Sequence, residues 1–531
     1  MKLSPGAGAL LLSILAAPLV RAGDWNNNGG NAERNGLSDE VGPLAADPLW
    51  NGGRSSIIAW QPVIAGRRVF SVRQTGFPPG GEPNGSPVVC QDLDTGVELW
   101  FRNVPYVAGD WTTWILGAGG GRVYASRSGN GSSVSQVVYA LDETSGATVW
   151  TSAEAIDAGP YDGVVFAPNG DLVVGNQTTV KRISAADGTT VWSTPRLCNV
   201  TSSCGVALHG DGVYLAEAAV GGNAIRKLDL ASGAGLYVSP VMPGFTLQNT
   251  PFVGPDGTVY LSRTQNNPAT DFLYAFEDTG VALIQRWFVD AGWTTTSEFA
   301  CDPAGDVYML DRAYHVRRLD PATGATVATS ASPIASGSAA PHFAVDRSGK
   351  VFVSNGGFGN GRLFAFDPDL SLRWSLAVPN VNQGGPALGA DGTLVMAGTG
   401  TNLFALRSAC AVPAALAVRN GGTNPQSLEA SLPILGSTFT ATVDVGASGH
   451  SMALLFGSAT AADIPLGRGR RLLCGSTGVA FQVTRPGPLA SFALPIPLDL
   501  ALCGRTFCVQ AVHLGGPAYR LSNALDLTFG G

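Results

Sequence analysis

Aromatic, amide and acidic side chains stand just before a series of short apolar segments, where they could together bind a polar ligand. Two tryptophans share a local pattern, since AGDWTT (108–113) and AGWTT (291–295) place Trp111 and Trp293 at corresponding points. Aromatic faces and amide groups suit a flat, polar or glycan-like ligand. A purely structural role, in which these side chains cap strands and close a channel, explains them as well. The candidates are Trp111, Trp114, Tyr161, Asp162, Gln248, Asn249, Trp293, Glu298, His342 and Gln383.

The sequence offers few residues that could act in catalysis or bind a metal ion. Asp162 and Glu298 are the only acids expected near this group, because most other acids fall in turn sequences. The chain has no G-x-S-x-G, H-E-x-x-H or P-loop motif. Its five histidines do not lie at ligand spacing from a cysteine pair, and the haem attachment motif C-x-x-C-H is absent. We therefore predict no catalytic residue, no metal site and no bound cofactor.

The elements that position the candidates come from a repeat with the spacing of propeller blades, about 40–50 residues. Strings such as YALDETSGATVW (139–150) combine a strand, a turn ending in Thr-Gly or Ser-Gly, and a tryptophan. Upstream hairpins carry Asn-Gly, Asp-Gly, Ala-Gly or Ser-Gly at their turns. Each unit is therefore predicted to be a four-stranded antiparallel sheet. The copies end at Trp100, Trp150, Trp192, Tyr237, Trp287, Ala328 and Trp374.

An eighth copy starts at residues 403–408 and stops without its turn and tryptophan. Asp47-Pro48-Leu49-Trp50 precedes the first hairpin and can supply the missing fourth strand. Pairing the two ends in this way closes the ring and removes exposed strand edges. Seven full repeats, one partial repeat and one donated strand predict an eight-bladed all-β propeller.

The strand order of a blade predicts where a site can form. Turns after the first and third strands share one face, which we name the turn face, and loops after the second and fourth strands share the opposite loop face. Irregular segments 71–87, 125–136, 262–271 and 354–362 all follow second strands. Binding sites are commonly built from variable loops on a rigid scaffold. We therefore expect the ligand at the loop face, around a central funnel lined by the candidates above.

The repeat resembles that of the PQQ-like propellers, the family of the quinoprotein dehydrogenases and of the assembly lipoprotein BamB. The signature A-x-D-x-x-T-G-x-x-x-W is matched at Ala140, Asp142, Gly146 and Trp150, with one inserted residue. Asp94-Thr95-Gly96 with Trp100 match its second half, and the leader WNNNGGNAERNGLS (25–38) is similar to the opening segment of such propellers. The resemblance covers about residues 24–408. It implies a fold, in which the Thr-Gly turn needs positive φ and the tryptophan wedges between blades.

By this resemblance, a quinone enzyme would bind pyrroloquinoline quinone with calcium, which needs converging oxygen ligands and a carboxylate base. The alcohol dehydrogenases of the family also place a disulfide of adjacent cysteines over the cofactor, and this sequence has no adjacent cysteines. We therefore favour a non-enzymatic binding or scaffold protein. The alternatives are a PQQ- and calcium-dependent dehydrogenase of alcohols or sugars, and a glycan-binding protein that uses Trp111 and Trp293.

Three segments divide the chain. Residues 1–22, MKLSPGAGALLLSILAAPLVRA, have the basic start, apolar core and small-x-small end of a signal peptide. Residues 23–408 form the expected propeller. Residues 409–531 alternate polar and apolar positions and predict a β-sandwich that resembles C-terminal modules of secreted bacterial proteins. The protein is thus expected to be exported by a bacterium to the periplasm, cell surface or medium.

Export permits disulfides. Cys410, Cys474, Cys503 and Cys508 can form two bridges in three ways, and Cys198 and Cys204 are close enough for a local bridge. Cys90 and Cys301 are expected to be free and buried.

The composition limits the possible partners. The net charge of −7 argues against nucleic acid, which needs a basic face. No transmembrane segment is predicted. We expect a monomer that binds an unidentified protein or glycan.

Overall fold

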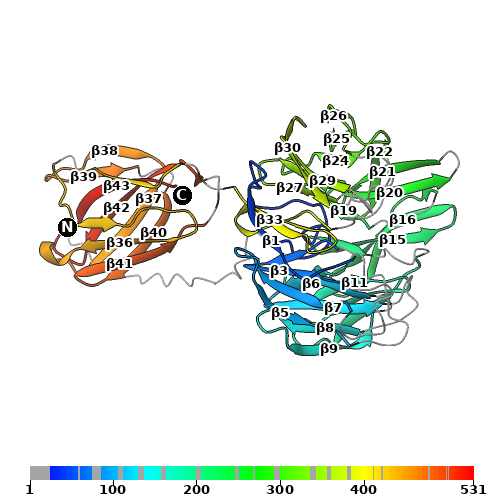
Figure 1. The fold of residues 1–531 in the computed structure, drawn as a ribbon. Coiled ribbons are helices and arrows are strands. Elements are labelled where there is room, and N and C mark those ends of the chain that lie inside the picture. Colours follow the sequence, from blue (N-terminus) through cyan, green and yellow to red (C-terminus); the bar gives the residue numbers. More distant parts are fainter. Residues whose placement is uncertain are drawn as a thin grey trace, which may run out of the picture.

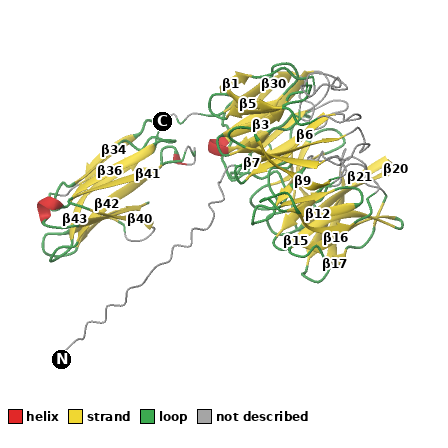
Figure 2. Cartoon of the chain, turned by 90° about the horizontal axis from the view of Figure 1, so that it is seen from below, coloured by secondary structure: helices red, strands yellow, loops and turns green. Residues whose placement is uncertain are grey.

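The structure is a computed structural model. It describes residues 24–57, 60–74, 85–105, 112–128, 137–156, 163–198, 205–244, 250–266, 269–291, 299–334, 342–355, 360–379, 384–408, 410, 412–419, 422–475, 479–497, 499 and 502–530. The predicted signal peptide lies outside this part of the chain. Strands and turns dominate, so the all-β prediction is confirmed (Figure 1). The only helical elements described are 3-10 turns, Ala390–Gly392 (η3) and Gly446–Ser448 (η4), drawn red in Figure 2. In the described ranges, no helix is long and apolar enough to cross a bilayer.

Antiparallel sheets of four strands succeed one another along residues 48–406, and we number them in chain order. Sheets 1 to 3 consist of β2 (Val63–Ala65), β3 (Arg68–Val72), β4 (Val88–Asp92) and β5 (Glu98–Arg102); β6 (Thr112–Gly119), β7 (Arg122–Ser128), β8 (Val137–Asp142) and β9 (Thr148–Ala155); and β10 (Val165–Phe166), β11 (Leu172–Gly175), β12 (Thr179–Ile183) and β13 (Thr190–Pro195).

Sheet 4 gains a short fifth strand, β18 (Met242–Pro243), which pairs with its third strand. Sheets 4 to 6 consist of β14 (Val206–His209), β15 (Gly212–Ala219), β16 (Gly222–Asp229) and β17 (Gly235–Val238); β19 (Phe252–Val253), β20 (Val259–Asn266), β21 (Ala269–Asp278) and β22 (Leu283–Ala291); and β23 (Ala300–Cys301), β24 (Val307–Leu310), β25 (Val316–Leu319) and β26 (Thr326–Thr329).

Sheet 8 joins the two ends of this region. Its strand order is β1-β33-β32-β31, so the N-terminal strand β1 is its outermost strand, as the sequence predicts. In Figure 1, the blue β1 lies beside the yellow β33 although more than 300 residues separate them. Sheets 7 and 8 consist of β27 (His342–Val345), β28 (Val351–Asn355), β29 (Asn360–Phe366) and β30 (Leu372–Pro379); and β31 (Ala387–Gly389), β32 (Thr393–Ala397), β33 (Leu403–Leu406) and β1 (Pro48–Gly52). The fold is a β-propeller.

Each tryptophan of the repeat joins its sheet to the next one. The indole N–H of Trp100 donates to the carbonyl of Glu143 at 3.0 Å, and Trp150 bonds Ala185 in the same way at 3.0 Å. The ring lies on the glycine of the next turn: a Cβ on Gly146 would stand 2.6 Å from the Trp100 ring. Glycine is needed there both for this close approach and for its φ of 67°. The interpretation of these tryptophans as wedges between sheets is therefore confirmed.

One junction replaces the tryptophan and the glycine together. Sheet 6 carries Ala328 at the tryptophan position, and the turn of sheet 7 carries Leu370. Leu370 is buried, with Ala328 packed against the same cluster. A small residue on one side and a large one on the other thus keep this junction filled.

Residues 25–38, which we name the inner segment, run around the centre of the propeller and close its turn face. Their backbone exchanges hydrogen bonds with Ile64 of β2, accepts from Cys301 of β23 at 2.7 Å and accepts from Val345 of β27 at 2.7 Å. The side chain of Asn27 donates to Val164, just before β10, at 3.1 Å. Further bonds reach β6, β14, β19 and β31, so the inner segment contacts all eight sheets in chain order. These bonds satisfy innermost backbone groups that would otherwise be unpaired.

The last part of the chain forms two larger sheets around a separate core, and a third sheet of two strands, β38 and β39. The five-stranded sheet has the order β34-β43-β42-β37-β40, and the three-stranded sheet has the order β35-β36-β41. Buried side chains of both sheets, including Phe439, Leu455 and Leu527, form one cluster between them. The strands are β34 (Ala415–Arg419), β35 (Leu428–Ala430), β36 (Thr438–Asp444), β37 (Met452–Ser458), β38 (Ala461–Pro465), β39 (Arg471–Cys474), β40 (Val479–Pro486), β41 (Leu489–Pro495), β42 (Thr506–Leu514) and β43 (Arg520–Thr528).

The cysteines of this region pair in one of the three possible ways, Cys410 with Cys503 and Cys474 with Cys508. Cys90 and Cys301 are free and buried, as predicted. The proposed bridge between Cys198 and Cys204 involves a residue outside the described ranges.

Candidate functional site

The predicted funnel is described at two of its ten candidates, Trp114 and His342. The other eight lie outside the described residues, and their placement stays a prediction; they are Trp111, Tyr161, Asp162, Gln248, Asn249, Trp293, Glu298 and Gln383.

Trp114 lies near the start of the innermost strand of sheet 2 and is 5% exposed. Its ring centroid is 4.3 Å from that of Trp60, which precedes the innermost strand of sheet 1, and the two rings are tilted by 48°. Trp114 also belongs to a buried cluster with Ile156 and Val174. The indole therefore seals the boundary between neighbouring sheets, which is the structural role weighed for it.

His342 is the first residue of the innermost strand of sheet 7 and is 6% exposed. Burial lowers the pKa of its imidazole to about 4, so the ring is neutral near pH 7. Its Nδ1 is buried without a hydrogen-bond partner among the described residues. Such a nitrogen is an open polar position at the predicted funnel.

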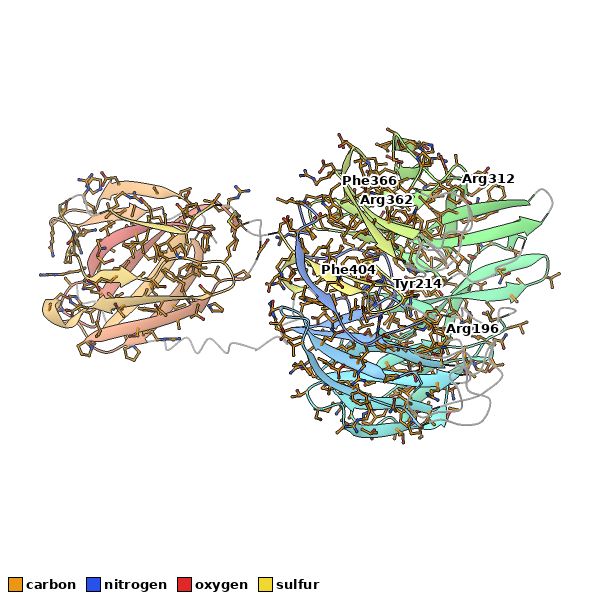
Figure 3. The ribbon with its side chains drawn as sticks, viewed as in Figure 1. Arg196, Tyr214, Arg312, Arg362, Phe366 and Phe404 are labelled. Atoms are coloured by element: carbon orange, nitrogen blue, oxygen red, sulfur yellow. A yellow bond between two sulfur atoms is a disulfide. The ribbon has the colours of Figure 1, made fainter. Side chains whose placement is uncertain are left out.

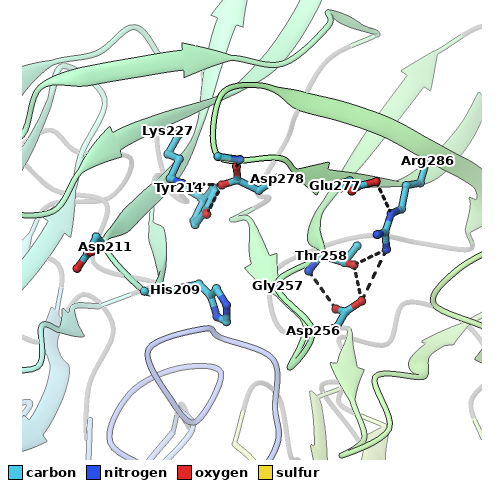
Figure 4. A pocket seen from close by; sticks show the side chains of 12 residues that line it. His209, Asp211, Tyr214, Lys227, Asp256, Gly257, Thr258, Glu277, Asp278 and Arg286 are labelled. Carbon is cyan, nitrogen blue, oxygen red and sulfur yellow. Dashed lines mark hydrogen bonds and ion pairs between the residues drawn. The ribbon is translucent and has the colours of Figure 1, made fainter.

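A cavity of about 460 Å³ opens at the turn face, between sheets 4 and 5, and we name it the interblade pocket (Figure 4). It occurs at the junction where Tyr237 stands in place of the repeated tryptophan. The facing turn of sheet 5 also differs, because a Cβ on Gly280 would meet nothing within 4 Å. The pocket is lined by His209, Gly210, Asp211, Tyr214, Lys227, Asp256, Gly257, Thr258, Glu277, Asp278, Gly280 and Arg286.

The inner wall of the interblade pocket is a partly buried ion pair held by two tyrosines. The Lys227 ammonium donates to Asp278 Oδ2 at 2.7 Å and to the Tyr237 hydroxyl at 3.0 Å. Tyr214 donates to the same carboxylate oxygen at 2.6 Å, and Tyr237 donates to Oδ1. The ammonium also lies 5.4 Å and 5.3 Å from the centroids of the Tyr214 and Tyr237 rings. Figure 3 shows Tyr214 among the green strands of the propeller.

These contacts fix the charges of the wall. Burial opposes ionisation of Asp278, but bonds from Lys227, Tyr214 and Tyr237 outweigh it and lower the pKa of Asp278 to about 2. Burial likewise opposes the charge on Lys227, yet the bonds to Asp278 and Tyr237 raise its pKa above the usual value. Burial and the bond to Asp278 raise the pKa of the Tyr214 hydroxyl. The wall thus keeps one ammonium, one carboxylate and neutral hydroxyls across the physiological pH range.

The outer wall, on sheet 5, is more exposed. Arg286 donates to the Thr258 hydroxyl at 3.0 Å and lies 3.7 Å from Asp256 and 3.4 Å from Glu277. The side chains of Asp256 and Glu277 are 43% and 49% exposed, so their carboxylates remain open to solvent.

The inner segment reaches the edge of this pocket. Nδ1 of His209 lies 3.6 Å from Glu33 Oε1, and this neighbour raises the pKa of His209. Asp211 is exposed, and its carboxylate has no hydrogen bond or ion pair among the described residues. The interblade pocket therefore combines a rigid, charge-balanced wall with an acidic mouth.

The quinone cofactor of the dehydrogenases was tested against the described residues. In the described ranges, no group of three or more His, Cys, Asp or Glu side chains could hold a metal ion. Trp114 and His342 supply no carboxylate, and the predicted funnel acids lie outside these ranges. The described residues of the funnel therefore supply no carboxylate ligand for calcium, and we derive no step through pyrroloquinoline quinone.

The sequence held two signals for the interblade pocket that the repeat interpretation did not use. Tyr237 departs from the tryptophan of the repeat, and Lys227 is one of only four lysines in the chain. Where a residue departs from the repeat and no larger residue of the neighbouring sheet fills the space, the junction is a candidate site.

Comparison with known proteins supports the repeat. Residues 84–287 match the family described as outer membrane protein assembly factor BamB, which has the PQQ-like repeat. This part of the chain thus carries the PQQ-like propeller repeats that the sequence predicts. No curated protein matches the sequence.

Several solved structures are similar to this chain at low sequence identity. The quinohemoprotein alcohol dehydrogenase from Comamonas testosteroni is 12% identical, with 76% of this chain and 84% of that chain covered and a TM-score of 0.48. BamB from Moraxella catarrhalis is 13% identical, with 65% and 96% covered and a TM-score of 0.36. The C-terminal WD40 domain of Sif2 is 9% identical, with 70% and 99% covered and a TM-score of 0.46. At these identities and TM-scores, the likenesses carry no conclusion about the chemistry of this chain.

Proposed function

We propose that this chain is a non-enzymatic binding protein in which the propeller holds a polar ligand. The observation that carries this proposal is the interblade pocket, where the sheet-to-sheet wedge is replaced by bonded polar groups around a cavity of about 460 Å³. Cavities of this size fall in the range of small-molecule sites. The Lys227, Asp278 and tyrosine groups bond one another, so they form a preorganised wall and are not poised as an acid or a base.

The ligand class follows from the open groups of the pocket. Asp256 and Glu277 share the single cation Arg286, and Asp211 adds a third carboxylate, so the mouth is acidic overall. Carboxylates accept hydrogen bonds from amino and hydroxyl groups. We therefore expect a small ligand with both kinds of group, such as an amino sugar, which is a narrower form of the glycan alternative.

Export is part of the proposal. Two disulfides in the C-terminal region support it, because disulfides persist in oxidising compartments outside the cytoplasm. We place the protein in the periplasm, on the cell surface or in the medium, and we propose that it acts as a monomer.

The loop-face funnel is proposed as the second binding place, for a protein partner or a glycan. The open Nδ1 of buried His342 supports it. The inner segment closes the turn face, so a ligand for the central channel would enter from the loop face.

A thermal-shift and calorimetric test of the mature protein checks the proposal. The probes are glucosamine, glucose and spermidine, which separate amino, hydroxyl and purely cationic recognition. We expect saturable 1:1 binding of glucosamine, weaker binding of glucose, and loss of both in Tyr237→Trp. The indole of that variant is expected to lie over Gly280, which lines the cavity and has open space beside it, and the substitution removes the hydroxyl that bonds Asp278.

Leu236→Trp is the matched control, since Leu236 is the preceding residue of the same strand and is 50% exposed. This control should bind as the wild type does. Absence of saturable binding of any probe, or equal binding by Tyr237→Trp, would refute the pocket as the site.

A further inference from the structure

A second cavity, of about 300 Å³, lies in the C-terminal region and is lined only by apolar residues. We name it the apolar cavity. Phe439 and Leu494 come from the three-stranded sheet, and Phe481, Val509 and Leu527 come from the five-stranded sheet. The cavity therefore lies between the two sheets, beside their shared core.

Two aromatic rings of the lining pack against each other. The rings of Phe507 and Phe529 meet edge to face at 5.4 Å and 87°, which is a favourable arrangement for an aromatic pair. Pro495 and Pro497 lie on the opposite strand and are exposed, which places one side of the cavity at the surface. A close-packed core normally leaves no void of this size.

The lining determines what can occupy the space. A dry cavity of about 150 Å³ lined by Leu, Ile and Phe takes up benzene, so one about twice as large admits a longer hydrocarbon. The lining offers no polar group that could bond a polar ligand, and burying unpaired polar atoms there would be unfavourable. The occupant is therefore a hydrocarbon chain or ring system.

One cation is a close neighbour of the lining residues along the chain. Arg505 follows Leu502 and precedes Phe507, both lining residues, and its carbonyl accepts a bond from Phe529 N at 3.0 Å. Its side chain is exposed and makes no hydrogen bond or ion pair within the described part of the chain. A free guanidinium is a preferred partner of a carboxylate.

We infer that the apolar cavity binds the chain of a medium-length free fatty acid, with the carboxylate of that acid at Arg505. This site is separate from the interblade pocket and does not depend on the proposed function of the propeller.

The full mature protein is titrated calorimetrically with octanoate, decanoate and decanol. We expect saturable 1:1 binding in which decanoate binds about tenfold or more tighter than octanoate, because each buried methylene contributes about a fourfold gain in affinity. Decanol should bind more weakly than decanoate, since it lacks the charge that pairs with Arg505.

Two variants test separately where the hydrocarbon chain and the carboxylate of the ligand bind. Leu494→Trp fills the cavity and should abolish binding of both decanoate and decanol, whereas Leu489→Trp, on the outward side of the same strand and 60% exposed, should bind as the wild type does. Arg505→Gln should weaken decanoate at least fivefold and leave decanol unchanged, whereas Arg485→Gln, an exposed arginine of β40, should change neither.

Several results would overturn the inference. Absence of saturable decanoate binding, or unchanged binding by Leu494→Trp, would exclude the cavity as the site. Equal effects of Arg505→Gln on decanoate and decanol would exclude the carboxylate contact. Another such result would be that the wild type sediments with anionic phospholipid vesicles and binds no free decanoate. If Leu494→Trp abolished that sedimentation, the occupant of the apolar cavity would be the hydrocarbon chain of a membrane lipid and the inference would be wrong.

Discussion

The surroundings of Lys227 show how the replacement of a repeated tryptophan by Tyr237 alters the local chemistry. The Lys227 ammonium bonds a carboxylate and a hydroxyl at a junction where most neighbouring sheets pack an indole. A buried ion pair stabilises little by itself, yet removing one partner leaves an unpaired charge. The pair therefore constrains the pocket more than it strengthens the propeller.

Asp278→Asn should destabilise the protein by about 2 kcal/mol at pH 7, because the partly buried Lys227 then loses its counter-charge. The pKa of Asp278 is lowered to about 2, so its contribution is complete above its unfolded pKa of about 4 and is lost as the pH falls toward 2. Urea unfolding at pH 7 measures the change. Asp211→Asn, at an exposed carboxylate of the same pocket, should change the free energy of unfolding by less than about 0.5 kcal/mol; a similar loss in both variants would contradict the role of the pair.

His342 is expected to lower the free energy of unfolding as the pH falls from 7 to 5. Its folded pKa of about 4 lies below the unfolded value near 6.5, so the unfolded chain binds the proton more readily. The stability attached to the neutral ring is complete above pH 6.5 and falls by about 2 kcal/mol between pH 7 and pH 5. His342→Gln should remove this part of the pH dependence, as read from urea unfolding at both values. An unchanged pH slope in the variant would show that the imidazole is not buried in its neutral form.

At the level of single residues, sequence reasoning identified the wedges and missed the pocket. Trp100 and Trp150 follow a pattern with a physical role, so their packing could be predicted. Tyr237, Asp278 and Tyr214 lie far apart in the sequence and meet only because the sheets are adjacent. No local pattern shows which tyrosine will bond which carboxylate.

The turns and the tryptophans act together as elements that join one sheet to the next. Gly188 lies on Trp150, where a Cβ would approach a ring atom to 2.6 Å, whereas Gly280 faces open space. Both glycines have positive φ, 77° and 82°. The two glycines therefore differ chiefly in whether a tryptophan ring of the preceding sheet lies against them.

Gly188→Ala should destabilise the propeller by about 3 kcal/mol or more, since it combines backbone strain with a clash against the indole. Gly280→Ala should cost only the backbone strain, about 1 kcal/mol. Thermal and urea unfolding of the two variants give the comparison. Equal losses would show that the wedge does not require glycine.

Strand-level prediction succeeded where alternation and turn chemistry agree. In the C-terminal region, the alternation expected over residues 409–531 corresponds to long strands such as β36, β37, β41 and β42. The short strands β35 and β38 were not predicted, because three to five residues give too little alternation to recognise. The pairing of cysteines likewise depends on which strands become neighbours.

The whole molecule combines a closed ring with a central segment that ties the sheets together. Strand β1 completes sheet 8, and the inner segment bonds all eight sheets. The ring closure followed from a truncated repeat in the sequence. The path of the inner segment did not, because its polar residues bond backbone carbonyls that carry no sequence signal.

This architecture is a scaffold on which sites depend on departures from the repeat. The repeat itself supplies packing, and the described residues that leave the pattern form a preorganised polar pocket. We propose that the molecule binds a ligand and does not oxidise alcohols or sugars with pyrroloquinoline quinone.

Titration of the purified mature protein with pyrroloquinoline quinone and calcium, followed by absorbance and thermal shift, tests that claim most directly. Dye-linked oxidation of alcohols and sugars is measured in the same samples. We predict no saturable change in absorbance, no shift of the unfolding temperature and no turnover. Saturable micromolar binding with turnover would contradict the account and identify the chain as a quinoprotein dehydrogenase.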